Sequence, residues 1–336
     1  MGFGTFVYNQ LVVQPPLPSL SFADQTVIIT GSNTGIGLET ARHIARLGAH
    51  KIILGVRNLS AGETARQDIE TSTGRPNACE VWHLDLASYD SVLTFADKAL
   101  SLPRLDALIE NAAVATKLFH LADGGYEHSL TVNNISTFLL ALLLLPKLQQ
   151  TAHSFPSRFH PPHLTILTSQ VHAWPQFPQW KDPRGVFTAL SDPRTAHMDE
   201  RYPVTKLLGV LLTRELVSQI KTKMEPNNPP VIINMVDTGF CHSQLSRENK
   251  GVEELAFNLF KRLFARTTEV GARTVLAAAS AGREAHGGYM VNGVVATEAV
   301  SGFVCSEDGK TAQKRVWEEL GGILEGVRPG VMGGLK

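Results

Sequence analysis

The chain has few cysteines and no excess of either charge, and each absence excludes a class of protein. Its cysteines, Cys79, Cys241 and Cys305, are widely spaced and form no Cys-x-x-Cys pair. This spacing argues against a disulfide framework and a zinc site, and we expect no bound metal. Lysine plus arginine equals aspartate plus glutamate, at 31 each among 336 residues. We therefore expect neither nucleic acid nor an anionic membrane as a partner.

Long apolar runs are also missing. The longest, from Phe138 to Leu145, is far shorter than the ~20 residues that span a bilayer, so we expect a buried helix and no transmembrane segment. The N-terminus has no basic region followed by an apolar stretch and a cleavage site, which argues against a secretory signal. Together these features predict a cytoplasmic protein.

The N-terminal residues contain Pro15 and Pro16 and show no clear period, which predicts an arm on the domain surface. A membrane-touching role for Phe3, Phe6 and Tyr8 is the alternative. We divide the chain into an arm (1–21), a single α/β domain (22–320) and a C-terminal tail (321–336).

A strand, a glycine-rich turn and a helix open the domain. Thr26 to Ile29 is a β-branched apolar run, and residues 38–47 have helical periodicity. The turn between them lets a backbone approach a pyrophosphate at a helix N-terminus, although a plain turn is the alternative. Its candidate cofactor-binding residues are Gly31, Ser32, Asn33, Thr34, Gly35, Ile36 and Gly37.

The second strand, Lys51 to Val56, lacks the acidic residue that binds the ribose 2′-hydroxyl of NAD. Arg57 stands there instead and suits a 2′-phosphate, so NADP(H) is favoured over NAD(H). An ordinary exposed arginine is the alternative.

Polar residues follow each later strand as well. Asp85 after the third strand either meets the adenine or caps the next helix, and both alternatives stay open. Asn111, Ser169 and Asp237 follow the fourth, fifth and sixth strands. Strands that alternate with helices predict a doubly wound, mainly parallel sheet of about seven strands, a Rossmann fold. Ligands bind at the carboxyl ends of such strands.

The segment 170–201 has little helical or strand pattern and contains two tryptophans. An irregular segment of this length predicts a functional loop over the active site, with a disordered insertion as the alternative. His172, Trp174, Trp180 and His242 are candidate substrate contacts.

Tyr202 and Lys206 are four residues apart and would project from one face of a helix. A neighbouring ammonium would lower the phenol pKa and make Tyr202 a proton donor or acceptor. A half-buried tyrosine beside an exposed lysine is the alternative.

In this order, the motifs resemble the short-chain dehydrogenase/reductase family over about residues 22–320. The matching residues are Thr30-Gly31-x3-Gly35-Ile36-Gly37, Asp85-Leu86, Asn111-Ala112-Ala113, Val132-Asn133, Thr168-Ser169 and Tyr202-x3-Lys206. Flanking segments resemble fungal members related to retinol dehydrogenases, many of which act on polyketide or terpenoid intermediates.

The resemblance implies catalytic roles for four residues. Tyr202 would be the acid/base, Lys206 would lower its pKa and bind the nicotinamide ribose, and Ser169 would bind the substrate oxygen. Asn133 would hold a water that links Lys206 to solvent, with the adjacent Asn134 as the alternative for this role. Further cofactor contacts carried over by the resemblance are Asp85, Leu86, Asn111, Ala112, Gly239 and Ser243, besides Tyr202 and Lys206.

Some positions depart from the family pattern. Glu110 and Ala113 replace an asparagine and a glycine, and Ser136 stands where relatives often have glycine. Thr238-Gly239 replaces Pro-Gly, which predicts a less rigid loop at the nicotinamide.

The sequence thus predicts an NADP-dependent oxidoreductase that interconverts an alcohol and a ketone or aldehyde on a bulky apolar small molecule, in secondary metabolism. The alternatives are a general carbonyl reductase similar to retinol dehydrogenases, a non-catalytic cofactor-binding protein, and a dehydratase or epimerase. A homodimer or homotetramer is the family-level expectation.

Overall fold

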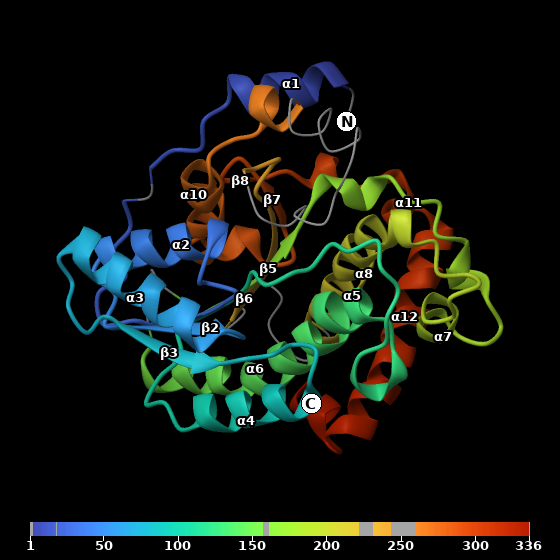
Figure 1. Cartoon of the computed structure of the whole chain (residues 1–336). Coiled ribbons are helices and arrows are strands. Elements are labelled where there is room, and N and C mark those ends of the chain that lie inside the picture. The colour runs from blue at the N-terminus through green and yellow to red at the C-terminus, as the bar shows by residue number, and fades with distance from the viewer. Residues whose placement is uncertain (1–2, 18, 157–160, 222–230, 243–259, 336) are drawn as a thin grey trace.

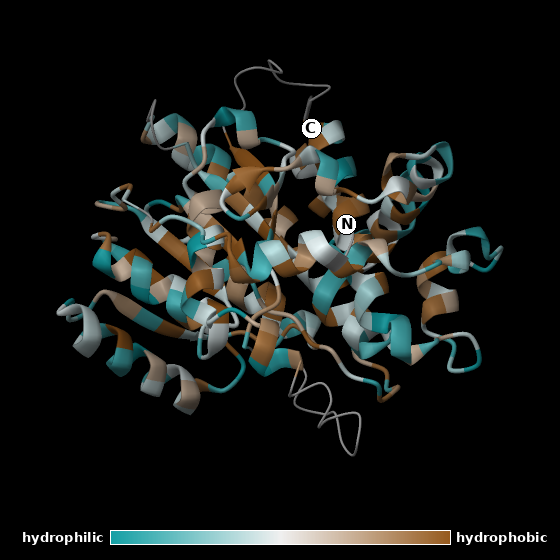
Figure 2. Cartoon of the chain, turned by 90° about the horizontal axis from the view of Figure 1, so that it is seen from above, coloured by the Kyte–Doolittle hydropathy of each residue, from teal (hydrophilic) through white to brown (hydrophobic). Residues whose placement is uncertain are grey.

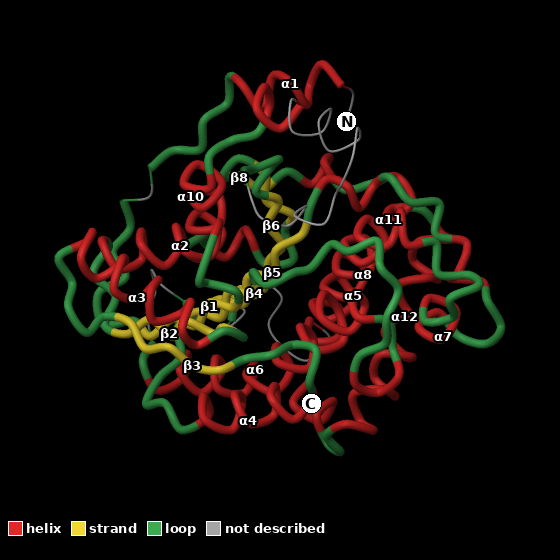
Figure 3. Tube along the Cα trace, viewed as in Figure 1, coloured by secondary structure: helices red, strands yellow, loops and turns green. Residues whose placement is uncertain are grey.

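One eight-stranded sheet forms the centre of the computed structural model, which describes residues 3–17, 19–156, 161–221, 231–242 and 260–335 (Figure 3). The strand order is β3-β2-β1-β4-β5-β6-β7-β8, with β1 to β7 parallel and β8 antiparallel to β7. The strands are β1 (Thr26–Thr30), β2 (Lys51–Val56), β3 (Cys79–His83), β4 (Ala107–Glu110), β5 (His163–Thr168), β6 (Ile232–Asp237), β7 (Tyr289–Val291) and β8 (Val294–Val295). The predicted doubly wound, mainly parallel sheet is confirmed.

Helices cover both faces of this sheet (Figure 1). One face carries α2 (Gly35–Arg46), α3 (Leu59–Thr73) and α10 (Thr268–Ala279). The other carries α4 (Tyr89–Leu100), α6 (Thr137–Ser154) and α8 (Arg201–Lys221), and α12 (Glu307–Val327) packs on α8. Shorter helices are α1 (Phe3–Leu11), α5 (His128–Leu130), the π-helix η2 (Thr131–Ser136), α7 (Val186–Leu190) and α11 (Gly302–Cys305).

Two apolar cores result, because successive residues of a strand point to opposite faces. Val27 and Ile29 belong to the core under α2 and α10, whereas Ile28 belongs to the core under α6 and α8. This explains why the strands are apolar throughout rather than alternating. Figure 2 shows the hydrophobic residues concentrated in the strands and inner helix faces.

The apolar run at Phe138 lies in α6, as predicted. One helical stretch in the described part of the chain, His128–Ser154, could cross a membrane by length and composition alone. In its most apolar window 83% of the residues are buried, which is the pattern of a core helix.

The N-terminal arm differs from the prediction because it contains a helix, α1. Phe6 of α1 stacks on Phe260, with 6.0 Å between the ring centroids, while the Tyr8 side chain is exposed. The side chain of Phe3 lies outside the described residues. The membrane-touching role of these residues stays a prediction.

The segment after β5 is more ordered than its sequence indicates. The 3₁₀ helix η3 (Gln170–Ala173) packs against α8, but Trp180 and α7 lie against α12. Arg315 of α12 donates to the Trp180 carbonyl at 3.0 Å, and Glu319 accepts from the Val186 amide at 2.6 Å. Two parts of the segment are therefore next to the helix that carries Tyr202: its first turn, and the stretch around Leu190 and Ala196, whose carbonyls accept from Arg201.

The predicted tail does not begin at residue 321, because that position lies inside α12. Leu324 of α12 and Val331 beyond it are buried. The apolar period of this helix continues past the boundary that the sequence suggested.

Candidate active site

Every described candidate at a strand end lies at one edge of the sheet. Six strand-end loops, after β1 to β6, carry these residues, and all six strands are parallel. The strand order reverses between β1 and β4, and such a reversal is where open α/β sheets bind ligands.

The glycine turn after β1 has a backbone that only glycine adopts easily. Gly31 and Gly35 have φ of +65° and +64°, in the left-handed region. A Cβ on Gly37 would lie 2.5 Å from Asn111 Nδ2, which donates to the Thr30 and Gly31 carbonyls at 2.7 and 3.1 Å. Asn111 thus supports the turn from the loop after β4.

The residues of this turn fit a dinucleotide. Thr34 precedes α2, and its side chain does not accept a hydrogen bond from the first N–H groups of the helix. These N–H groups can therefore donate to a bound anion. Space is open where a Cβ of Gly35 would be, which leaves room for a pyrophosphate. Ser32 is buried and donates to the Ile29 carbonyl at 2.9 Å, so its hydroxyl braces the turn.

At the adenosine end, Arg57 is exposed directly after β2, and Asn58 caps α3 by accepting from the Ala61 amide at 3.0 Å. The guanidinium is thus available beside a fixed backbone. The contact of Arg57 to a 2′-phosphate stays a prediction.

Asp85 does not cap the next helix, so that alternative is wrong. Its Oδ1 accepts from the Ala87 amide at 2.9 Å, before the helix begins. Asp123 accepts from Tyr89, the first residue of α4, at 3.0 Å. Leu86 lies in the apolar core.

Glu110, the departure from the family asparagine, is buried at the end of β4. Its carboxyl accepts from the Thr30 hydroxyl at 3.2 Å, and that hydroxyl accepts from the amides of Asn111 and Ala112, each at 3.0 Å. Burial raises the pKa of Glu110 to about 8. The carboxyl is therefore mostly protonated at neutral pH and acts as part of the support for the turn.

We expect Glu110→Gln to remove a pH dependence of stability. Between pH 4.5 and about 8 the folded chain holds a proton that the unfolded chain releases, so the free energy of unfolding falls as the pH rises. The variant should be more stable than the parent at pH 8 by roughly 1–4 kcal/mol, with little difference at pH 4.5. Urea unfolding at several pH values measures this, with exposed Glu298→Gln as the control. Parallel pH curves for parent and Glu110→Gln would contradict the account.

Tyr202 and Lys206 lie on the first turns of α8, as the spacing predicts. Lys206 Nζ is 5.6 Å from the centroid of the Tyr202 ring and donates to the Leu167 carbonyl at 2.9 Å. Arg201 fixes the start of this helix through a fully buried ion pair with Glu127, at 3.1 Å. Sequence reasoning missed Arg201 because nothing local distinguishes it from a surface arginine.

The sign of the Tyr202 pKa shift corrects the prediction from spacing. Burial, with a smaller contribution from the Asp237 carboxylate, raises the pKa of Tyr202, and Lys206 is not among the causes. Burial also lowers the pKa of Lys206 to about 8. The chain alone thus provides a neutral phenol beside a lysine that can gain or lose a proton near neutral pH.

Asn133 connects the π-helix η2 to α8. Its side chain donates to Thr205 Oγ1 at 3.0 Å and to the Val114 carbonyl at 2.9 Å, and it accepts from the Val114 amide at 2.8 Å. Both N–H groups of this amide are taken by the protein, so a water held by the side chain would donate to Oδ1. The Asn134 side chain also donates to α8, to the Thr205 carbonyl at 2.9 Å. Asn134 is completely buried, unlike Asn133.

Ser169 lies at the start of η3, beside α8. Its carbonyl accepts from the buried His172 ring at 2.8 Å, and the other ring nitrogen of His172 accepts from the Ser301 amide at 3.0 Å. His172 therefore positions Ser169 and is shielded from substrate. Trp174 and His242 are exposed, and Trp180 packs against the core.

Asp237 is a buried carboxylate at this site. The sequence showed only that it follows the sixth strand and gave it no role. Its oxygens accept from the amides of Gln170 and Gly239 at 3.0 and 2.9 Å, so it ties the loops after β5 and β6 together. Burial raises the pKa of Asp237. Gly239 is held by this bond, and the lower rigidity expected of the Thr238-Gly239 loop stays a prediction. Ser243 lies outside the described residues.

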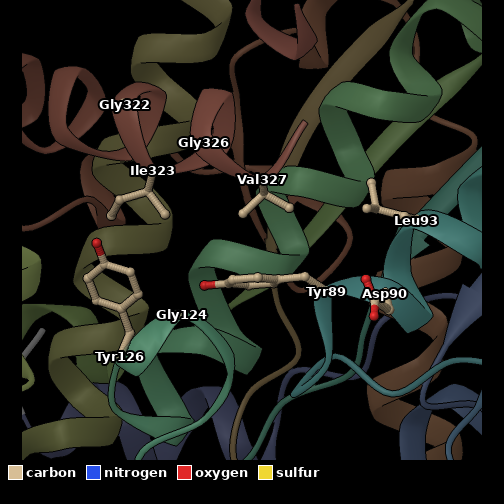
Figure 4. A pocket seen from close by; sticks show the side chains of 9 residues that line it. All are labelled: Tyr89, Asp90, Leu93, Gly124, Tyr126, Gly322, Ile323, Gly326 and Val327. Atoms are coloured by element: carbon tan, nitrogen blue, oxygen red, sulfur yellow. The ribbon is translucent and has the colours of Figure 1, made fainter. Parts of the chain in front are cut away.

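A hollow of about 520 Å³ lies elsewhere, between α4, Gly124 and α12. Figure 4 shows Tyr89 and Tyr126 below Ile323 and Val327 of α12. None of the candidate site residues lines it. This hollow is therefore not the candidate active site.

Comparisons with known proteins identify the family to which this chain is similar. A family model described as short chain dehydrogenase matches residues 25–154. Short chain dehydrogenase/reductase dmxR8 of Cryptosporiopsis sp. is 44% identical over 97% of this chain and 98% of its own length. Short-chain dehydrogenase anuD of Penicillium roqueforti is 41% identical over 97% of this chain and 84% of its own.

Solved structures share the fold. An uncharacterized protein from Mycobacterium paratuberculosis matches with a TM-score of 0.60 and 25% identity over 90% of this chain and 94% of its own. A Beutenbergia cavernae protein, described as an NAD(P)-dependent gluconate 5-dehydrogenase and solved with bound NADP, matches with a TM-score of 0.57 and 20% identity. That alignment covers 81% of this chain and 96% of the other.

Proposed function

Because the chain belongs to the short-chain dehydrogenase/reductase family, we propose that it is an NADP(H)-dependent oxidoreductase that interconverts an alcohol and a ketone or aldehyde. The observation that carries the proposal is the position of Tyr202 and Lys206 on α8, at the sheet edge that also bears the glycine turn. Proton-transfer groups and a dinucleotide-binding turn at one edge are what carbonyl reduction requires.

The nicotinamide, when bound, supplies a hydride to the carbonyl carbon and becomes oxidised. The chain supplies the proton: Tyr202 donates its phenol proton to the carbonyl oxygen, which becomes the alcohol. Tyr202 holds that proton firmly in the resting site, since burial raises its pKa. Lys206, with a pKa of about 8, is suited to return a proton to the phenolate. Ser169 donates to the same substrate oxygen and stabilises its developing charge.

We propose that the substrate is a bulky apolar small molecule of fungal secondary metabolism. Support comes from the fungal relatives and from aromatic residues beside the site: Phe240 follows Gly239 and lies 5.5 Å from Phe260, centroid to centroid. A polyketide or terpenoid intermediate with a ketone or aldehyde group has this chemistry.

For cofactor choice we expect Arg57→Asp to weaken NADPH far more than NADH. Loss of a charge-assisted bond to the 2′-phosphate should cost roughly 1.5–3 kcal/mol, or about ten- to a hundredfold in affinity. Fluorescence titration with both cofactors measures this, and exposed Arg194→Asp is the control. Equal affinity of the parent for the two cofactors would overturn the preference.

The test of the proposed function is turnover by the purified chain with NADPH and a panel of apolar ketones and aldehydes. Reduction should consume one NADPH for each alcohol formed, as measured by absorbance and mass spectrometry. Binding of NADPH without turnover on any member would favour a non-catalytic protein instead.

A further inference from the structure

We propose that α1 belongs to the active-site machinery and that Gln10 is a positioning residue for the loop after β6. The inference rests on the proposed function, because it concerns the nicotinamide end of the same site. It starts from a side chain that sequence reasoning placed on a surface arm.

Gln10 is buried, and its amide is hydrogen-bonded on both sides. Nε2 donates to the Phe240 carbonyl at 2.7 Å and to the Phe264 carbonyl at 3.0 Å. Oε1 accepts from the Phe240 amide at 3.2 Å. One side chain therefore connects the chain shortly after β6 to the chain shortly before α10.

Arg266 makes the reciprocal connection from the other side. Its guanidinium donates to the carbonyls of Asn9 and Val13 at the end of α1, the latter at 2.8 Å. Its backbone amide donates to the Phe240 carbonyl at 2.8 Å. A cation at a helix C-terminus is also electrostatically favourable, so α1 is held in a fixed orientation.

This connection reaches the proposed nicotinamide end through Gly239. A Cβ on Gly239 would lie 2.6 Å from Gln10 Oε1, and the residue has φ of +74°. A small hollow is lined by Phe6, Asn9 and Gln10 of α1 together with Gln170, Asp237 and Gly239 of the sheet edge. α1 thus packs directly on the Thr238-Gly239 loop, which Asp237 also holds. In the family pattern a proline stiffens this loop, and here the hydrogen bonds of Gln10 take that role.

The experiment compares Gln10→Met, which keeps the volume and loses three hydrogen bonds, with Tyr8→Met on the exposed side of α1. Two ligands are titrated: NADPH, and adenosine 2′,5′-bisphosphate, which lacks the nicotinamide half. We expect Gln10→Met to raise the Kd of NADPH by tenfold or more and to lower kcat, with the Kd of the bisphosphate unchanged. Hydrogen exchange of the Phe240 amide should accelerate in Gln10→Met alone.

Two results would overturn the inference. If Gln10→Met leaves the NADPH affinity, kcat and the Phe240 exchange rate unchanged, α1 is a surface arm with no role in the site. Equal loss of affinity for both ligands, with a lower melting temperature, would assign Gln10 a general structural role. Because exchange at Phe240 needs no cofactor, failure of the proposed function is distinguished from failure of this contact.

Discussion

Tyr202→Phe should reduce kcat for carbonyl reduction by about a thousandfold, while the Kd of NADPH changes by less than about threefold. The variant loses one hydroxyl, and general acid catalysis by a positioned side chain contributes about 10²- to 10⁴-fold. Burial keeps the Tyr202 phenol protonated in the parent, and phenylalanine at this position has no proton to donate.

The matched control is Tyr126→Phe. Tyr126 is also partly buried, but it lines the hollow beside α12 and none of the candidate site residues does. The control should keep kcat within about twofold. Single-turnover kinetics with saturating NADPH measure the chemical step, and substantial turnover in Tyr202→Phe would remove the phenol from the mechanism.

Gly35→Ala should abolish NADPH binding at millimolar concentration, or at least weaken it a hundredfold. The new methyl group would occupy the open space before α2 that we assign to the pyrophosphate. Gly35 has a left-handed backbone with φ of +64°, so an alanine there should also lower the free energy of unfolding by about 1–2 kcal/mol.

Gly74→Ala separates these two effects. Gly74 ends α3 with φ of +66° and also has open space at its Cβ, so its substitution carries the same backbone cost away from the turn. The two variants should unfold at similar denaturant concentrations, and only Gly35→Ala should lose NADPH. Equal NADPH affinity in both variants would show that the pyrophosphate does not lie at Gly35.

Local patterns were sufficient for most of the fold. β-branched runs such as Thr26 to Ile29 identify strands buried on both faces, and the turn glycines locate the helix that follows. The carboxyl ends of parallel strands lie at the same edge of a sheet. The candidate residues that follow each strand were therefore expected at one edge. These inferences need only neighbours in sequence.

Long-range contacts were beyond such reasoning. Gln10 and Phe240 are 230 positions apart, and no period in residues 1–21 indicates their hydrogen bonds. The same holds for α12, whose Glu319 binds α7 across 133 positions. The Tyr202 pKa had the wrong predicted sign because spacing reveals the nearby lysine but neither burial nor Asp237.

Transfer of deuterium from NADPH that carries deuterium at both hydrogen positions of nicotinamide C4 tests the central claim most directly. With a bulky apolar ketone that the chain consumes, mass spectrometry should find one deuterium on the carbinol carbon of each alcohol, and none from labelled solvent. Product formed without that deuterium, and without net oxidation of NADPH, would contradict hydride transfer and indicate dehydration or epimerisation on the same fold.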